Sequence, residues 1–230
     1  MNDNMEDGSF RQFLTDAFMN AMMVMRPGAA FYIWHADSEG YNFRGACRDS
    51  MLRVRQCLIW VKNALNMGRS DFQWKHEPCL YGWKEGAGHY FINDRTQTTV
   101  FEDKADLDKY TKDELKELVE EILADKLPTT VIHEDKPQKN DVHPTMKPIK
   151  LISRLVKNSS RQGENVIDFF GGSGSTLISC EHLGRNCYTI ELDPKYVDVI
   201  IDRWETLTGE TAIKIIEGVV TEKELEEEEE

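Results

Sequence analysis

A glycine-rich stretch between two short apolar runs constrains the fold of this chain more than any other feature. Residues 164–193 read ENVIDFFGGSGSTLISCEHLGRNCYTIELD, with acids, Asp168 and Glu191, at the ends of the two apolar runs. This order predicts a strand, a turn, a helix from Ser175 to Leu183 and a second strand, the first half of a Rossmann-type unit. Glycines permit a tight turn and the close approach of a ligand, and the second acid can accept hydrogen bonds from a ribose. We therefore expect a nucleoside-bearing cofactor over the strand ends.

Other motifs that such a turn could belong to are incomplete in this sequence. Leu177 stands where the dinucleotide pattern G-x-G-x-x-G requires its third glycine, and no G-x-x-x-x-G-K-[ST] is present. Ser175 replaces the last glycine of the hydrolase pattern G-x-S-x-G. A purely structural strand-to-helix turn is the alternative for this stretch taken alone.

Several blocks of the chain carry a resemblance to one family. DFFGGSGST, at residues 168–176, resembles the cofactor loop D-P-F-x-G-S-G-T-T of the amino-group DNA methyltransferases. HPTMKP, at residues 143–148, resembles the block that precedes this loop in the beta arrangement of the family. In that arrangement the catalytic blocks come first, and three earlier stretches resemble them in the expected order: FYIWHAD (31–37), QCLIWVKN (56–63) and HEPCLYGWK (76–84).

The resemblance implies a fold, a cofactor and a set of residues that hold the cofactor. The fold is a three-layer α/β Rossmann-like methyltransferase domain with a mostly parallel sheet, and the cofactor is S-adenosylmethionine. Glu191 would hold the ribose hydroxyls, while Thr145 and Lys147 would hold the methionine carboxylate at a helix start beside Pro148. The full set of cofactor-binding candidates is Thr145, Lys147, Asp168, Phe170, Gly172, Gly174, Ser175 and Glu191.

The catalytic tetrapeptide of the family, D-P-P-Y or a variant such as S-P-P-Y, is missing. The sequence contains no Pro-Pro pair, and only MNDNMEDG precedes the first expected helix, where the tetrapeptide belongs. We therefore expect a methyltransferase chain cut directly after this motif, with no assignable catalytic residue. Trp34, His76 and Tyr81 are the candidates for the remaining wall of a base pocket.

The implied function is site-specific methylation of double-stranded DNA by direct transfer to an amino nitrogen, without a metal. We expect adenine N6 rather than cytosine N4 as the target, because the blocks resemble adenine-specific members, which phages and prophages often carry. Restriction-modification is the corresponding biological setting. Two alternatives stay open: a non-catalytic module or subunit that binds the cofactor or DNA, and a methyltransferase that acts on RNA or a small molecule.

The sequence divides into four expected regions. Residues 1–84 hold the catalytic-half blocks, 85–140 a target-recognition-like insertion, 141–216 the cofactor-binding half and 217–230 an acidic tail. Within the insertion, Arg95, Lys136 and Lys139 are candidate DNA contacts, although a solvated surface is the favoured interpretation for each. An acidic helix expected over residues 111–126 carries a leucine stripe that could serve a homodimer.

The formal net charge of −13 opposes DNA binding only if it is spread evenly. The acidic tail carries eight acids against one lysine, and residues 102–126 carry ten acids against five lysines. The rest of the chain is therefore nearly neutral, and charge neither supports nor excludes a DNA substrate.

Cysteine usage and hydropathy indicate the compartment. The five cysteines form no C-x-x-C pair, which favours reduced thiols over a disulfide frame or a zinc site. No apolar run approaches the roughly 20 residues of a membrane span. We expect a cytoplasmic protein of a bacterium or a phage-infected cell.

Outside these motifs, apolar periodicity predicts the remaining elements. A helix is expected from Ser9 to Met25 with Ser9 as its N-cap. Further helices are expected over residues 42–54, 149–156 and 195–206. Strands are expected over residues 28–34, 56–62 and 212–217, with another strand that ends at residue 83 and a pair of strands within residues 90–101.

Overall fold

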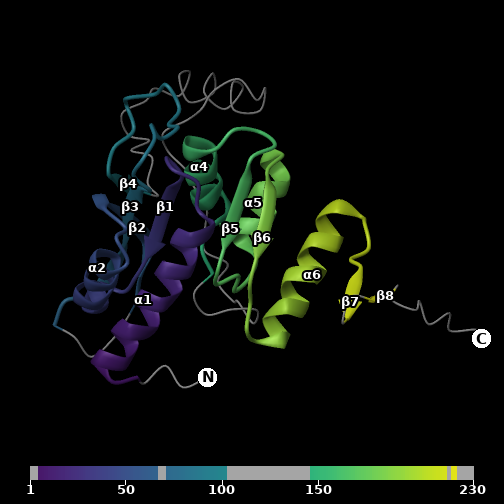
Figure 1. The fold of residues 1–230 in the computed structure, drawn as a ribbon, viewed down its shortest axis with the longest axis horizontal. Coiled ribbons are helices and arrows are strands. Elements are labelled where there is room, and N and C mark those ends of the chain that lie inside the picture. The colour runs from purple at the N-terminus through teal and green to yellow at the C-terminus, as the bar shows by residue number, and fades with distance from the viewer. Residues whose placement is uncertain (1–4, 67–70, 103–145, 217–218, 222–230) are drawn as a thin grey trace, which may run out of the picture. The chain divides into compact units, whose positions relative to one another are not determined.

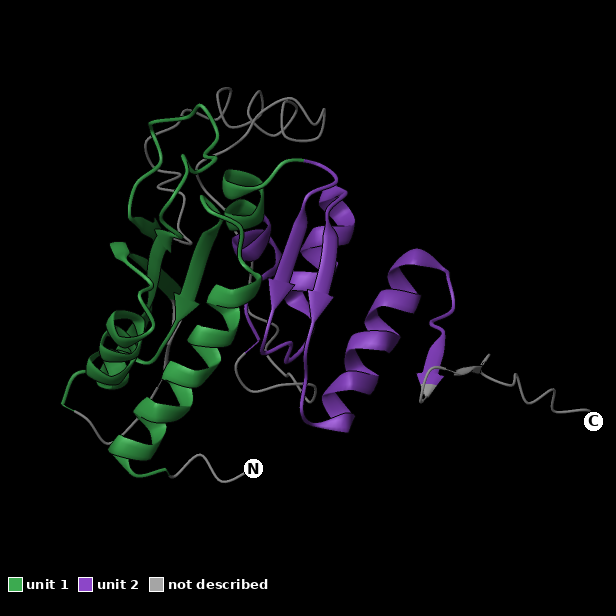
Figure 2. Ribbon diagram, viewed as in Figure 1, with its two compact units in different colours: residues 1–139, 154–161 green, residues 140–153, 162–230 purple. Residues whose placement is uncertain are grey.

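The computed structural model describes residues 5–66, 71–102, 146–216 and 219–221 (Figure 1). The expected acidic helix, together with Lys136, Lys139 and Thr145, lies outside these residues. The chain divides into two compact units (Figure 2). Unit 1 comprises residues 1–139 with 154–161, and unit 2 comprises residues 140–153 with 162–230.

Unit 1 is built on a four-stranded sheet with the strand order β1-β3-β2-β4. Strand β3 is antiparallel to both of its neighbours, and β2 and β4 are parallel. Two helices, α1 and α2, flank β1 in the chain. The bounds are α1 Asp7–Val24, β1 Ala30–Trp34, a 3-10 turn Asp37–Glu39, α2 Gly40–Asp49, β2 Val54–Asn66, β3 Trp74–Trp83 and β4 Val100–Glu102.

The register of β1 against β3 assigns side chains to the two faces of this sheet. Ile33 lies opposite Leu80, and directly opposed residues share a face. This face packs on α1 and α2 in a buried cluster: Leu14, Phe18, Phe31, Ala46, Cys47, Leu52 and Leu80. On the other face, the rings of Tyr32 and Tyr81 stack at 4.9 Å, and the Tyr32 hydroxyl lies 2.7 Å from Ser159 Oγ in helix α4 (Ile149–Ser159). Helices α1 and α2 therefore pack on one face of this sheet, and the end of α4 contacts the other.

Unit 2 contains the strand, turn, helix and strand expected around the glycines. Strands β5 and β6 are parallel, with Val166 opposite Cys187, and α5 joins them. Helix α5 contacts both β6 and α6 (Figure 1). A short antiparallel pair, β7 and β8, follows α6. The bounds are β5 Asn165–Asp168, α5 Ser175–Leu183, β6 Asn186–Thr189, α6 Pro194–Thr208, β7 Lys214–Ile216 and β8 Val219–Thr221.

Three local expectations are wrong. The helix expected over 42–54 ends earlier, since α2 ends at Asp49 and β2 begins at Val54. Helix α1 begins at Asp7 after Glu6, so Ser9 lies inside its first turn instead of capping it. The strand pair expected within 90–101 is replaced, up to the start of β4, by irregular chain. There Asp94 accepts hydrogen bonds from Thr96 N and Oγ1 and from Gln97 Nε2. A side chain that captures nearby backbone and side-chain donors in this way favours a turn over a strand.

The cysteine side chains and helix lengths bear on the expected compartment. Cys47, Cys79 and Cys180 are buried, and Cys57 and Cys187 are half-buried. Within the described ranges, no helix is both long and apolar enough to cross a membrane.

Leu80 should be the most sensitive position of the unit 1 core, since its side chain is 0% exposed. Leu80→Ala should lower the free energy of unfolding by about 2–5 kcal/mol, because the cavity left in the cluster cannot close fully. Urea unfolding followed by tryptophan fluorescence measures this, as four of the five tryptophans belong to unit 1. Met23→Ala on the outer side of α1, at 81% exposed, is the control and should change stability by less than about 0.5 kcal/mol.

Candidate functional site

The loop between β5 and α5 is fastened to the chain that leaves β6. Ile190 N donates to Asp168 O at 2.9 Å, and Gly171 N donates to Ile190 O at 2.9 Å. These bonds continue the parallel pairing beyond the two strands. They bring the acids that follow β5 and β6, Asp168 and Glu191, to one end of unit 2.

Glu191 is held by backbone N–H groups. Its Oε2 accepts from Gly172 N at 2.7 Å, and its Oε1 accepts from Leu192 N at 2.8 Å and Asp193 N at 2.9 Å. Hydrogen bonds to a carboxylate are stronger than neutral ones, so this side chain is well oriented. Because a carboxylate offers about four lone-pair sites, Glu191 retains capacity for a further donor such as a hydroxyl.

Asp168 anchors the start of the loop and of helix α5. Its Oδ1 accepts from Phe170 N at 3.1 Å, and its Oδ2 accepts from Thr176 Oγ1 at 2.6 Å. Burial raises the pKa of Asp168, and the negative charge of Glu191 adds to the rise. The two hydrogen bonds and the positive charge of Lys147 act in the opposite direction, but the net shift of the pKa is upward.

The loop requires glycines for two reasons, the backbone conformation and the close packing of neighbouring residues. Gly172 and Gly174 have φ of 53° and 77°, in the left-handed region that favours glycine. A Cβ on Gly171 would lie 2.6 Å from Thr189 Oγ1 and 2.9 Å from Ile200 Cδ1, so the loop rests directly on β6 and α6. Close packing from below therefore requires a glycine at position 171, whatever binds above the loop.

Serine hydroxyls tie helix α5 to the segment before α4. Ser175 Oγ donates to Lys147 O at 3.0 Å, and Ser179 Oγ donates to Ile149 O at 3.2 Å. Both serines are buried. The Ser175 hydroxyl thus holds the end of the HPTMKP block beside the glycine loop.

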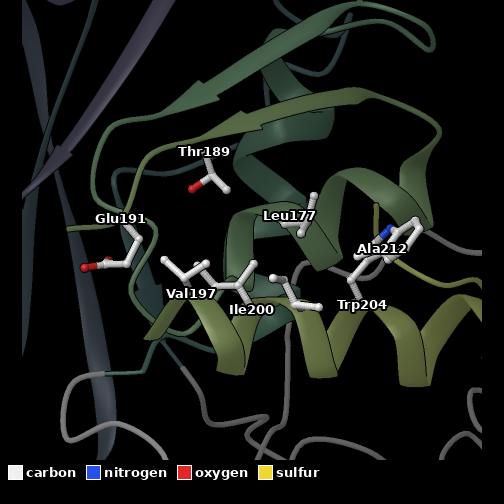
Figure 3. A pocket seen from close by; sticks show the side chains of 8 residues that line it. Leu177, Thr189, Glu191, Val197, Ile200, Trp204 and Ala212 are labelled. Carbon is white, nitrogen blue, oxygen red and sulfur yellow. The ribbon is translucent and has the colours of Figure 1, made fainter. Parts of the chain in front are cut away.

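A pocket of about 260 Å³ adjoins Glu191 (Figure 3). Its lining comes from α5, the end of β6, α6 and the chain beyond: Leu177, Thr189, Glu191, Val197, Ile200, Ile201, Trp204 and Ala212. Thr189 Oγ1 is buried there without a hydrogen-bond partner among the described residues. With no lysine or arginine in the lining, the pocket suits an apolar or aromatic group and not a phosphate.

The structure brings together the described cofactor-binding candidates. Lys147, Asp168, Phe170, Gly172, Gly174, Ser175 and Glu191 all belong to the loop or to segments tied to it, and Phe170 is 57% exposed beside Asp168. Sequence reasoning missed Thr176 and Arg203, which donates to Ser173 O. The helical spacing of Ile200 and Arg203 (i, i+3) puts both on one side of α6 and could have revealed the second.

The three candidates for a base-pocket wall do not share one face of their sheet. Trp34 lies opposite Cys79, so Trp34 and Tyr81 point to one face, whereas His76, an odd number of residues away, points to the other. Tyr81 is only 5% exposed because its ring stacks on Tyr32. Trp34, half-buried and edge-on to Trp60 at 6.3 Å, keeps some surface at the end of β1.

The sequence profile of the N6/N4 DNA methylase family matches residues 1–202. The chain belongs to this DNA methylase family. The type II methyltransferase M.HpaI of Haemophilus parainfluenzae is 36% identical over 64 residues, which are 28% of this chain and 20% of that protein. In this match the present chain therefore spans about a fifth of the relative's length.

Solved structures share the fold of this chain. The M1.HpyAVI–SAM complex superposes with a TM-score of 0.62 and 19% identity, over 84% of this chain and 82% of that one. The cytosine-N4-specific PvuII DNA methyltransferase gives 0.59 and 14%, over 89% and 73%. The expected α/β methyltransferase fold is confirmed, with both parallel and antiparallel strand pairs among the described strands.

Asp168 should make the stability of this protein depend on pH. A carboxyl whose pKa is raised by folding stabilises the fold below its unfolded pKa, and this contribution is lost as the pH rises through the folded value. Asp168→Asn keeps the shape without the charge. Relative to wild type it should gain stability as the pH rises above about 4, by about 1.4 kcal/mol for each unit by which folding raises the pKa. Urea unfolding at a series of pH values measures the difference, and a difference that stays constant with pH would contradict the prediction.

Proposed function

We propose that this chain binds S-adenosylmethionine and acts in site-specific methylation of double-stranded DNA at an exocyclic amino group. The observation that carries the proposal is the arrangement around Glu191. Its carboxylate is oriented by three backbone N–H groups at the ends of parallel strands and still has room to accept from a ribose hydroxyl. Family membership supplies the class of reaction.

The described residues fit this cofactor in chemical type. Glu191 would accept from the ribose, and the exposed ring of Phe170 would pack on an apolar part of the cofactor. Lys147, in the segment tied to α5 by Ser175, would pair with the methionine carboxylate together with Thr145. The pocket beside Glu191 has space for an apolar or aromatic group of the cofactor, and the Thr189 hydroxyl that lines it is unpartnered among the described residues.

The bound cofactor supplies a methyl group on a positively charged sulfur, and the residues of the chain contribute position and charge. Asp168 and Glu191 place two carboxyl groups at the same loop, which favours a cationic ligand over an anionic one. The hydrogen bonds of Gly171 N and Gly172 N fix the loop, and a fixed loop would orient the bound cofactor toward an approaching substrate amine. Trp34 is the side chain of unit 1 that we assign to the flipped base.

The preferred target is adenine N6, which the likeness of the catalytic blocks to adenine-specific members supports. Arg95 is exposed in the turn around Asp94 and is available for a phosphate. A second candidate function, a cofactor-binding subunit without turnover of its own, is favoured by one observation: the 230 residues contain no Pro-Pro pair and hence no D-P-P-Y motif.

Calorimetric titration with S-adenosylmethionine tests the cofactor site. Wild type should bind saturably, and Glu191→Ala should weaken binding by about tenfold or more, since it removes a charged hydrogen-bond acceptor. Glu181→Ala is the matched control, because this exposed acid of α5 accepts only from Trp204 Nε1, at 3.1 Å, among the recorded bonds. Equal affinity in wild type and Glu191→Ala, with both proteins folded, would reject the assignment of Glu191.

Transfer of a labelled methyl group to DNA separates the two candidate functions. Incubation with unmethylated DNA, followed by nucleoside analysis, should yield N6-methyladenine if the chain turns over. N4-methylcytosine would overturn the preferred target while keeping the reaction class. Cofactor binding without any methylated nucleoside would favour the subunit.

A further inference from the structure

Arg203 links three parts of unit 2 from the side of helix α6. Its guanidinium donates a hydrogen bond to the carbonyl oxygen of Ser173, in the glycine loop. The same Nη1 lies 3.7 Å from the sulfur of Met146, which directly precedes Lys147. The α6 helix itself starts just after Glu191, where Asp193 Oδ1 accepts from Lys195 N at 3.0 Å. One side chain thus connects the loop, the chain after Glu191 and the segment that carries Lys147.

The Arg203 cation is half-buried, yet no ion pair to it is recorded among the described residues. Burial lowers its pKa, but an arginine stays charged at any pH at which the protein folds. Removing a charge from water without an opposite charge beside it costs free energy. A residue kept there at that cost has a role that a neutral apolar side chain would not fill.

The bond to the Ser173 carbonyl gives Arg203 a direct restraint on the glycine loop. Three of the four residues from 171 to 174 are glycines, which leave the backbone unusually free. Gly174 N donates to Gly171 O at 2.8 Å, and Gly172 N is held by Glu191. The bond from Arg203 holds the peptide plane between Ser173 and Gly174 on its carbonyl side, and the Gly174 N–H holds the same plane on its other side. This plane ends at Gly174, the N-cap of α5, and its orientation sets how that helix start faces a ligand.

We propose that Arg203 is a positioning residue for the part of the cofactor site that takes the methionine end, acting through Ser173 and Met146 without touching the cofactor. The inference rests on the proposed function and goes beyond it by naming the subsite that Arg203 serves. The ribose end depends on Glu191, which Arg203 does not contact, so the two ends of the cofactor should respond differently to its loss.

The test compares two ligands on three variants by calorimetric titration. S-adenosylmethionine has the amino-acid end, whereas 5′-methylthioadenosine has the same adenine and ribose and lacks that end. Arg203→Met should weaken S-adenosylmethionine by about tenfold while changing 5′-methylthioadenosine less than about twofold. Arg203→Lys, which retains a charged donor, should restore most of the affinity.

Arg185→Met is the matched control for a purely structural effect. Arg185 also donates to a carbonyl, that of Leu183, but at the far end of α5. It should lower the melting temperature to a similar degree as Arg203→Met and leave both affinities unchanged. An unchanged S-adenosylmethionine affinity in Arg203→Met, or an equal loss for both ligands, would overturn the proposal. Wild type that binds neither ligand would instead reject the proposed function itself.

Discussion

The candidate site depends on the bonds that three backbone N–H groups make to the Glu191 carboxylate. Gly172 contributes one of them from the loop, and Leu192 and Asp193 contribute the others from the start of α6. A glycine-rich loop has little conformational preference of its own, so its shape must be imposed by a fixed neighbour. The charged acceptor at the end of β6 supplies that neighbour. The loop, the end of β6 and the entry into α6 are thereby specified together.

Charge around this loop is balanced by a small number of groups. Asp168 and Glu191 are near enough that the charge of Glu191 raises the pKa of Asp168, while the positive charge of Lys147 offsets part of that rise. Arg203 adds a second positive charge from beneath the loop. On the proposed function, carboxylates face a cofactor that carries a positive sulfur and an ammonium, whereas cations serve its carboxylate. The acidic and the basic side chains around this turn would therefore serve different parts of the cofactor.

The sequence predicted the cofactor half of this chain well because its signals are local. Apolar runs that end on acids, three glycines and a helical segment lie within 30 residues, and helix α5 has the expected bounds, Ser175 to Leu183. The links that depend on distant residues escaped prediction. Arg203 reaches a carbonyl 30 positions earlier. The bond from Thr176 to Asp168 spans only eight positions and was missed because it depends on how the turn between them folds. Alternation along β3 would have separated His76 from Tyr81, but the faces became meaningful only with the strand register. At Asp94, hydrogen bonds to the side chain stabilise a turn where the sequence pattern predicted a strand.

The close seat of Gly171 on Thr189 and Ile200 also restricts how this sequence can diverge. A side chain at position 171 meets an oxygen of β6 and a methyl of α6 at once, so both neighbours would have to give way. Substitutions at these three positions are therefore not independent, and the order in which they arise matters. Descendants of this chain that acquire smaller residues at both position 189 and position 200 gain access to loop sequences that are closed to the present one. In this sense Thr189 and Ile200 set which loop variants evolution can sample.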